Sequence, residues 1–320
     1  MMSECGMVHI MMATYNGEKY IQEQLESILQ QTYTEWKLYI SDDGSTDHTR
    51  DIIRMYEEQN PERIIRLESD QKFRDAKKNF AFLYRCVPPA DYYAFCDQDD
   101  VWENTKLECM IQHIHEEEKD RLLVVYHDME IVAANKEVVD NSFVTYFGYT
   151  LNQRNAIKQI LLYNVIPGCS MLFNNEVKRM IEDIPESCVM HDWWIVLASL
   201  CLDGKVIFCR QPLSQYRQHD KNQIGAIKKK KNWQMAIQCV EIWKLPNYIK
   251  NNQKIKVERI RQTETLLHKF AMRMDAENRK QVEYFLKILT SKRRVYASLS
   301  AISNGYIFLN KLNTLKFFLL

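Results

Sequence analysis

The first hundred residues alternate between short apolar runs and segments with helical periodicity. The apolar runs have the length of buried strands and lie at residues 8–13, 38–40, 64–67 and 92–96. Between them, apolar residues recur every three or four positions, as in residues 21–29 and 52–56. Strands that alternate with helices predict an α/β fold with a doubly wound, mainly parallel, Rossmann-like sheet.

The pattern is more mixed after residue 122. Short strands are predicted at residues 122–126, 170–173 and 206–209, and helices at residues 157–162, 177–184 and 193–202. Beyond residue 225 the composition becomes rich in lysine and helical in period. We therefore expect one domain over residues 1–225 and a helical C-terminal extension over residues 226–320.

Polar residues follow three of the predicted strands directly, at residues 14–17, 42–45 and 97–100. In an open parallel sheet, ligands bind beyond the carboxyl ends of the strands. The three polar segments should therefore meet at one edge of the sheet and form a single site.

Asp97, Asp99 and Asp100 give that site its most distinctive chemistry. Carboxylates packed this densely repel one another, and a divalent cation such as Mg²⁺ or Mn²⁺ relieves the repulsion because both ions prefer oxygen ligands. Such a cation would hold a diphosphate and stabilise its charge as it leaves. The alternative is a solvated acidic turn, but the apolar pairs at residues 95–96 and 101–102 fix this segment on both sides.

The segment Asp42-Asp43-Gly44-Ser45 has two compatible interpretations. A carboxylate here could accept the imide N–H of uracil or thymine. The same residues could instead form a turn in which Ser45, Thr46 or Asp47 caps the next helix.

Two later segments also carry candidate chemistry. His191-Asp192-Trp193-Trp194 opens an apolar helix, where Asp192 is either a cap or a general base beside aromatic side chains that suit a sugar acceptor. Arg217 and His219 follow the last predicted strand and are either part of a polar loop or ligands for phosphate and metal.

Composition excludes several classes of protein. The 320 residues are 46% hydrophobic with a net charge of +1, which gives no reason to expect nucleic acid as a partner. Nine cysteines without a Cys-x-x-Cys pair indicate reduced thiols in the cytosol. We see no signal peptide and no apolar run of about 18 residues, so we expect a cytoplasmic protein.

Taken together, the motifs resemble the family 2 glycosyltransferases, which have the GT-A fold. The resemblance runs from about residue 8 to residue 225. It rests on Ala13-Thr14-Tyr15-Asn16-Gly17, Ser27-Ile28-Leu29-Gln30-Gln31-Thr32-Tyr33, Ser41-Asp42-Asp43-Gly44-Ser45-Thr46-Asp47, Asp97-Gln98-Asp99-Asp100-Val101-Trp102, Gly168-Cys169-Ser170-Met171 and His191-Asp192-Trp193-Trp194.

The resemblance implies transfer of a sugar, with inversion, from a nucleotide-diphospho sugar. If Asp43 accepts the N3–H of the base, the donor is UDP- or dTDP-linked. Donor-binding residues are expected at Thr14, Tyr15, Asn16, Asp42, Asp43, Asp97, Asp99 and Arg217. Mn²⁺ or Mg²⁺ is expected at Asp99, Asp100 and His219, with Asp192 as catalytic base and His191, Trp193 and Trp194 toward the acceptor. The family often has Glu before the catalytic Asp, so His191 is a departure.

The Cys-Asp-Gln-Asp-Asp-Val-Trp form and the Tyr-Arg-Gln-His segment are similar to the rhamnosyltransferase-like branch of the family. That branch uses dTDP-rhamnose to build bacterial surface polysaccharides. The Gln-x-x-Arg-Trp motif of processive members is absent. The acceptor would then be a saccharide or a lipid-linked saccharide at the inner face of the cell membrane.

Two alternatives compete with this interpretation. Residues 97–101 also fit the Asp-x-Asp-x-Val pattern of haloacid-dehalogenase-type phosphatases, which need a later lysine and a later acidic pair. The second alternative is a non-catalytic scaffold protein at a membrane surface. Lysines at residues 228–231 and apolar residues at 306–320 suit an anionic membrane surface, or else a helix packed on the domain.

Overall fold

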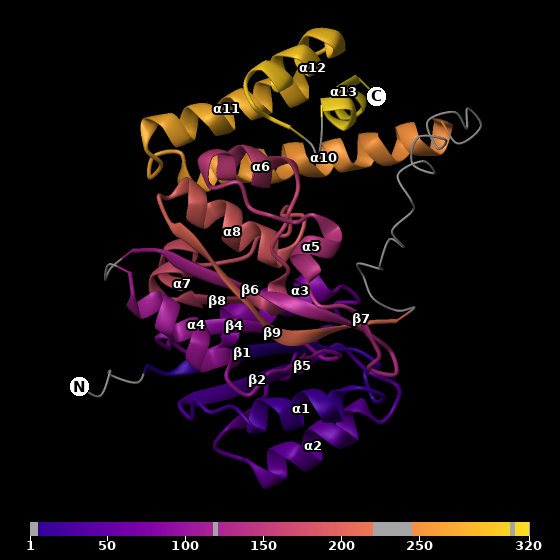
Figure 1. Ribbon diagram of the computed structural model, residues 1–320, viewed down its shortest axis with the longest axis vertical. Coiled ribbons are helices and arrows are strands. Elements are labelled where there is room, and N and C mark those ends of the chain that lie inside the picture. The colour runs from indigo at the N-terminus through magenta and orange to yellow at the C-terminus, as the bar shows by residue number, and fades with distance from the viewer. Residues whose placement is uncertain (1–5, 118–120, 220–244, 308–310, 320) are drawn as a thin grey trace.

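A mixed sheet of nine strands forms the centre of the protein, with helices on both of its faces (Figure 1). The structure is a computed structural model that describes residues 6–117, 121–219, 245–307 and 311–319. The strand order is β3-β2-β1-β4-β8-β6-β9-β5, and β7 pairs with β6.

The N-terminal half of the sheet is parallel, as the alternating pattern predicts. Its strands are β1 (Val8–Thr14), β2 (Trp36–Asp42), β3 (Ile64–Arg66) and β4 (Tyr92–Asp97). They alternate with α1 (Ile21–Leu29), α2 (Thr49–Gln59) and α3 (Ala76–Cys86).

Both faces of these parallel strands are buried, which explains why they read as continuous apolar runs. On β1, Ile10 and Met12 pack in the cluster that includes Leu25 of α1. Met11, between them, packs on the other face with Leu83 of α3. Burial on both faces requires helices on both sides, so the sheet becomes the middle of three layers.

The second half of the sheet is less regular. It contains β5 (Val101–Trp102), β6 (Leu123–Ala133), β7 (Val138–Asp140), β8 (Met171–Asn174) and β9 (Lys205–Gln218). Its helices are α4 (Lys106–His115), α5 (Phe143–Phe147), α6 (Ala156–Leu162), α7 (Asn175–Ile181) and α8 (His191–Cys201), with 3₁₀ turns at Gln153–Asn155 (η1) and Gly168–Ser170 (η2). β8 runs antiparallel to both of its neighbours, β4 and β6, whereas β9 runs parallel to β6.

Some element boundaries differ from the prediction. β9 continues well beyond residue 209, because a polar, irregular second half still pairs with β6 across a register shift. The α2 helix starts later than expected: its N-cap residue is His48, and the Asp47 carboxylate accepts the Thr49 N–H at 3.1 Å. The sequence analysis did not predict the helix α4.

Four further helices lie at the far end of the molecule from α1 and α2 (Figure 1). They are α10 (Leu245–Phe270), α11 (Ala276–Thr290), α12 (Arg294–Ser303) and α13 (Lys311–Leu319). Phe270 and Phe285 belong to the same apolar cluster as Trp194 of α8. These helices therefore share a core with the sheet, and the predicted boundary at residue 225 falls outside the described residues.

The apolar tail is packed against the protein at the positions that the structure describes. Tyr306, Phe317 and Phe318 are buried, which favours the packed alternative over a lipid-facing one for these side chains. The predicted basic run at residues 228–231 lies outside the described residues. None of the helices in the described ranges combines the length and hydrophobicity needed to span a bilayer.

Candidate active site

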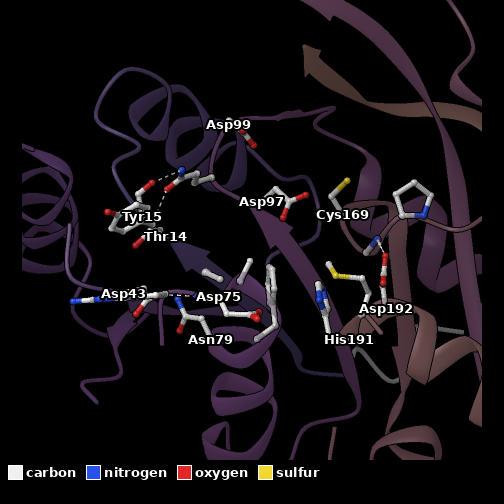
Figure 2. Close-up of a pocket in the computed structure, with 18 of the residues that line it drawn as sticks. Thr14, Tyr15, Asp43, Asp75, Asn79, Asp97, Asp99, Cys169, His191 and Asp192 are labelled. Carbon is white, nitrogen blue, oxygen red and sulfur yellow. Dashed lines mark hydrogen bonds between the residues drawn. The ribbon is translucent and has the colours of Figure 1, made fainter. Parts of the chain in front are cut away.

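A cavity of about 640 Å³ opens at the carboxyl edge of β1, β2 and β4 (Figure 2). It brings together seven residues that the sequence singles out: Thr14, Tyr15, Asp43, Asp97, Asp99, His191 and Asp192. Thr14, Tyr15 and Asp43 lie on one side, His191 and Asp192 on the other, with Asp97 between them. The predicted convergence of strand ends is therefore present in the structure.

Asp43 is buried at the end of β2 and supports the loop that follows β3. Its carboxylate accepts the backbone N–H of Phe73 at 2.5 Å and of Asp75 at 3.3 Å. A carboxylate offers about four lone-pair positions, so this one retains acceptor capacity toward the cavity. The turn interpretation holds as well, because the Asp42 carboxylate accepts the Gly44 N–H at 3.2 Å and the Ser45 N–H at 2.9 Å.

The loop after β3 supplies cavity residues that the sequence analysis missed. Lys72, Arg74 and Asp75 line the cavity, as does Asn79 at the start of α3. They follow the carboxyl end of a parallel strand, so the rule applied to the other three strand ends would have found them. Lys72 and Arg74 bring positive charge beside Asp43.

Asp42 and Asn16 hold the strand ends in place and do not line the cavity. Asp42 accepts the Thr14 hydroxyl at 2.9 Å and pairs with Arg50 at 2.7 Å. The Asn16 side-chain oxygen accepts the Thr46 N–H at 2.8 Å. Direct contact with a donor is thus not supported for either residue.

Gln98 joins the loop after β4 to the loop after β1. Its side chain accepts the Tyr15 N–H at 2.9 Å and donates to the Tyr15 carbonyl at 3.0 Å (Figure 2). A Cβ at Gly17 would come within 2.4 Å of the Gln98 oxygen, so only glycine permits this approach. The pair orders one wall of the cavity.

Burial and neighbouring carboxylates raise the pKa of Asp97, which lines the cavity, and of Asp100, which lies beneath it. Burial, and then the charge of Asp99, raise the pKa of Asp97 to about 7 and that of Asp100 well above its usual value. Asp100 is 1% exposed, and its Oδ2 has no partner among the described residues. The nearby Lys106 is buried and donates to the Cys169 carbonyl at 2.7 Å. Negative charge therefore exceeds positive charge here.

Asp99 meets His219 beside the cavity. His219 Nε2 lies 2.7 Å from Asp99 Oδ2, and the imidazole stacks on Tyr20 with ring centroids 4.9 Å apart. Arg217 donates to the Asp99 carbonyl at 3.0 Å and forms an ion pair with Glu23. Arg217 is buried and does not line the cavity, so it positions Asp99 and not a donor phosphate.

Two groups of side chains in this site could bind a divalent cation, and one of them fits a hard cation better than the other. Asp97 and Asp99 face the cavity, and His219 adds an imidazole nitrogen, a set that suits Mn²⁺ or Mg²⁺. Ligand atoms of Asp97, Asp100 and Cys169 also lie within 4.8 Å of one another. Burial and the two carboxylates raise the pKa of the Cys169 thiol, which makes it a poor ligand for such a cation. Asp100 supports the set from beneath.

Asp192 lies at the start of α8 with its carboxylate toward the cavity. It accepts the Gly168 N–H at 3.0 Å and the Trp193 N–H at 2.6 Å. The N-cap residue of α8 is Met190, so Asp192 is not the cap. Burial raises the pKa of Asp192 to about 6, against the lowering effect of these N–H groups. Desolvation therefore outweighs the backbone N–H groups at this helix N-terminus.

His191 lies beside Asp192 in an aromatic environment. Its ring stacks on the ring of Phe80, with the centroids 4.0 Å apart, and lies edge-to-face with the ring of Phe95, with the centroids 4.6 Å apart. Burial lowers the pKa of His191 to about 3, so the imidazole is neutral. Neither ring nitrogen has a partner among the described residues. A Cβ at Gly168 would lie 2.9 Å from His191 Nε2, so a glycine is needed there.

The two tryptophans of α8 belong to the core and not to the acceptor side. Trp193 donates to the Ile160 carbonyl at 2.5 Å, with the Arg259 guanidinium 3.8 Å from its ring centroid. Trp194 donates to the Asp183 carbonyl at 3.1 Å. Both are buried and neither lines the cavity, which corrects the expectation of an aromatic platform here.

Comparison with protein families identifies the chain. The model of "Glycosyl transferase family 2" matches residues 9–178, which is more than half of the sequence. The chain therefore belongs to glycosyl transferase family 2 and is a glycosyltransferase.

Curated relatives carry related names. The dTDP-rhamnosyl transferase RfbG of Shigella flexneri is 31% identical over 229 residues, covering 67% of this chain and 74% of that protein. The UDP-Glc:alpha-D-GlcNAc-diphosphoundecaprenol beta-1,3-glucosyltransferase WfgD of Escherichia coli is 30% identical over 165 residues, covering 51% and 58%.

Solved structures confirm the GT-A-like fold. S. aureus TarS 1-349 in complex with UDP matches with a TM-score of 0.54 and 16% identity, over 97% of this chain and 80% of that one. Mannosyltransferase PcManGT from Pyrobaculum calidifontis, in complex with GDP-Man and Mn²⁺, matches with a TM-score of 0.52 and 14% identity, over 99% and 86%.

Proposed function

We propose that this family 2 glycosyltransferase transfers one sugar, with inversion, from a UDP- or dTDP-linked donor to a hydroxyl of a saccharide or lipid-linked acceptor. The product would enter bacterial surface polysaccharide. The observation that carries the proposal is the single cavity that holds Asp43 at one side, Asp192 at the other and Asp97 and Asp99 between them. The relative named as a dTDP-rhamnosyl transferase makes dTDP-rhamnose our preferred donor.

The donor nucleotide would occupy the side of the cavity formed by Thr14, Tyr15 and Asp43. Asp43 has acceptor capacity left after binding Phe73 and Asp75, and the N3–H of uracil or thymine suits it. The half-exposed Tyr15 ring offers a surface for the base. Contact with Asp43 would place the diphosphate toward the acidic centre of the cavity.

Asp97, Asp99 and His219 would hold Mn²⁺ or Mg²⁺ at that centre, with Asp100 beneath. A divalent cation supplies charge stabilisation for the leaving diphosphate. This chain's own part is to fix the carboxylates: Arg217 holds the Asp99 backbone, and Lys106 holds the turn that carries Cys169.

Asp192 would remove the proton from the acceptor hydroxyl as that oxygen attacks the sugar carbon from the face opposite the diphosphate. Its position across the cavity from Asp43 fits that geometry. Two backbone N–H groups fix its rotamer, and the Gly168 N–H keeps one oxygen oriented. The neutral His191 beside it can hydrogen-bond a neighbouring hydroxyl without adding charge.

Donor selection tests the nucleotide assignment and the function together. We expect metal-dependent hydrolysis or transfer with a UDP- or dTDP-sugar. We also expect UDP or dTDP to bind about 10–150-fold more tightly than CDP, because cytosine has no N3–H for Asp43 and a hydrogen bond to a charged group contributes about 1.5–3 kcal/mol. Calorimetry of the three nucleotides measures this.

The variant Asp43→Asn supplies the control for base selection. An amide can face either a donor or an acceptor, so it should bring the affinities for UDP and CDP close together. Equal binding of UDP and CDP by the unaltered chain would remove Asp43 from the nucleoside site. Release of phosphate from small phosphoesters, with no nucleotide-sugar turnover, would instead support the phosphatase alternative. Nucleotide binding without any turnover would support the non-catalytic scaffold.

The pKa of Asp192 sets the acid limb of the pH profile. A base acts only when deprotonated, so kcat/KM should fall about tenfold per pH unit below about pH 6 and be level above it. With the ordinary pKa of an aspartate, that limb would lie near about pH 4. The rate should be measured with saturating metal, with nucleotide affinity followed in parallel. A level kcat/KM down to about pH 5 would contradict the raised pKa.

A further inference from the structure

The helix α12 turns its large apolar side chains outward. Val295 and Tyr296 are each 64% exposed and Leu299 is 58% exposed. Val295 and Leu299 are one helical turn apart, and Tyr296 lies beside them. The buried side of the helix carries the small residues Ala297 and Ala301. A surface helix normally has the opposite arrangement, with large apolar residues toward the core.

Positive charge borders this apolar surface. Lys292, Arg293 and Arg294 are all exposed at the start of α12. Lys256 of α10 is close enough to Arg294 for its pKa to be lowered, after the effect of burial, by that charge. Residues 284–320 contain six Lys or Arg and no Asp or Glu, whereas the chain as a whole is almost neutral. A local excess of positive charge therefore lies in this segment of the chain.

The placement of these cations does not serve the helix itself. The N-terminus of a helix carries partial positive charge, so acidic residues stabilise it and basic residues do the reverse. The first turn of α12 has no acidic residue, and Arg293 at the N-cap makes no side-chain capping bond. Lys292 and Arg293 at this position are explained by an external anion better than by helix stability.

We propose that the outer face of α12 docks on an anionic lipid bilayer. Val295, Tyr296 and Leu299 would enter the headgroup region, and Lys292 and Arg293 would meet lipid phosphates. A tyrosine with an apolar ring and a polar tip suits that boundary. A second copy of the chain fits less well, because a two-fold interface through this face would bring the two sets of cations together.

The surface also has room to meet a membrane. In Figure 1, α12 lies at one extremity of the molecule, at the opposite end from α1 and α2. The exposed fractions show that the described residues leave this face uncovered. The proposal rests on this surface and not on the catalytic assignment, so either can fail without the other.

The test is sedimentation of the full chain with vesicles. We expect binding to vesicles that contain phosphatidylglycerol, little binding to pure phosphatidylcholine, and release by salt. Lys292→Gln with Arg293→Gln should weaken binding by about 25-fold, at about fivefold per charge. Tyr296→Ser with Leu299→Ser should also reduce binding.

Matched controls remove the same side-chain classes elsewhere. Arg54→Gln with Arg85→Gln changes the net charge equally, and Met55→Ser with Met272→Ser removes two other exposed apolar side chains. These controls should bind like the unaltered chain, with unchanged melting temperature and donor hydrolysis in all variants. Equal loss in controls and α12 variants, or no binding to anionic vesicles, would overturn the proposal. So would a dimer that only the α12 variants dissociate, which would assign this face to a second copy.

Discussion

Replacement of Asp192 by asparagine is expected to lower the rate of sugar transfer by about 10²–10⁴-fold, the usual contribution of a general base. An asparagine amide keeps the size of the side chain and can still accept the Gly168 N–H at the position of the carboxylate oxygen. It cannot take a proton from the acceptor hydroxyl. The loss should therefore appear in kcat, with the fold intact.

Nucleotide affinity separates this effect from a general disturbance of the site. Asp192 lies across the cavity from Asp43, so UDP or dTDP should bind the variant as they bind the unaltered chain. Asp183→Asn is a matched control, because Asp183 is a half-exposed carboxylate shortly before α8 whose ion-pair partner is Lys269. It should leave turnover unchanged. A transfer rate for Asp192→Asn within a few-fold of the unaltered chain would contradict its role as base.

The residue before Asp192, His191, affects the charge beside the proposed base. Its ring nitrogens have no partner among the described residues, and burial keeps it neutral. A glutamate, which the family resemblance leads us to expect at this position, would add a second negative charge beside Asp192. A neutral imidazole reduces that repulsion, and Asp192 is then sensitive mainly to burial, which is what raises its pKa.

The sequence predicts the first half of the sheet well because each parallel strand there is buried on both faces. Burial on both faces makes apolar runs such as those containing Met11 and Phe95 easy to recognise. The extended β9 was missed because its second half combines polar residues with a register shift against β6. Pairing with a distant strand, not local pattern, determines its length.

The same contrast applies to the candidate site. Asp97, Asp99 and Asp192 could be found from the sequence because strand ends and helix starts place them. The core position of Trp193 could not be predicted, because it depends on a contact with the distant Ile160 carbonyl. The supporting role of Arg217 could not be predicted either, because it depends on an ion pair with Glu23. The extent to which burial desolvates Asp192 likewise depends on tertiary contacts.

Removal of divalent metal is the other change with a large expected effect. Charge stabilisation by a metal ion contributes several kcal/mol, which corresponds to a loss of about 10³-fold or more in turnover. Activity should vanish with excess chelator and return with Mn²⁺ or Mg²⁺. The physical reason lies in the site itself: burial and the charge of Asp99 raise the pKa of both Asp97 and Asp100, so a cation there would relieve uncompensated negative charge.

Substitutions locate the metal within the acidic cluster. Asp99→Asn should raise the metal concentration needed for half-maximal activity by at least about tenfold, since Asp99 faces the cavity and meets His219. Asp100→Asn should have a smaller effect, because Asp100 lies beneath the cavity and one of its carboxylate oxygens accepts the backbone N–H of Arg217. Asp91→Asn, at the opposite end of β4, is the matched control and should change nothing. A larger effect of Asp100 than of Asp99 would move the metal down to Asp97 and Asp100, and full activity in excess chelator would exclude a metal requirement.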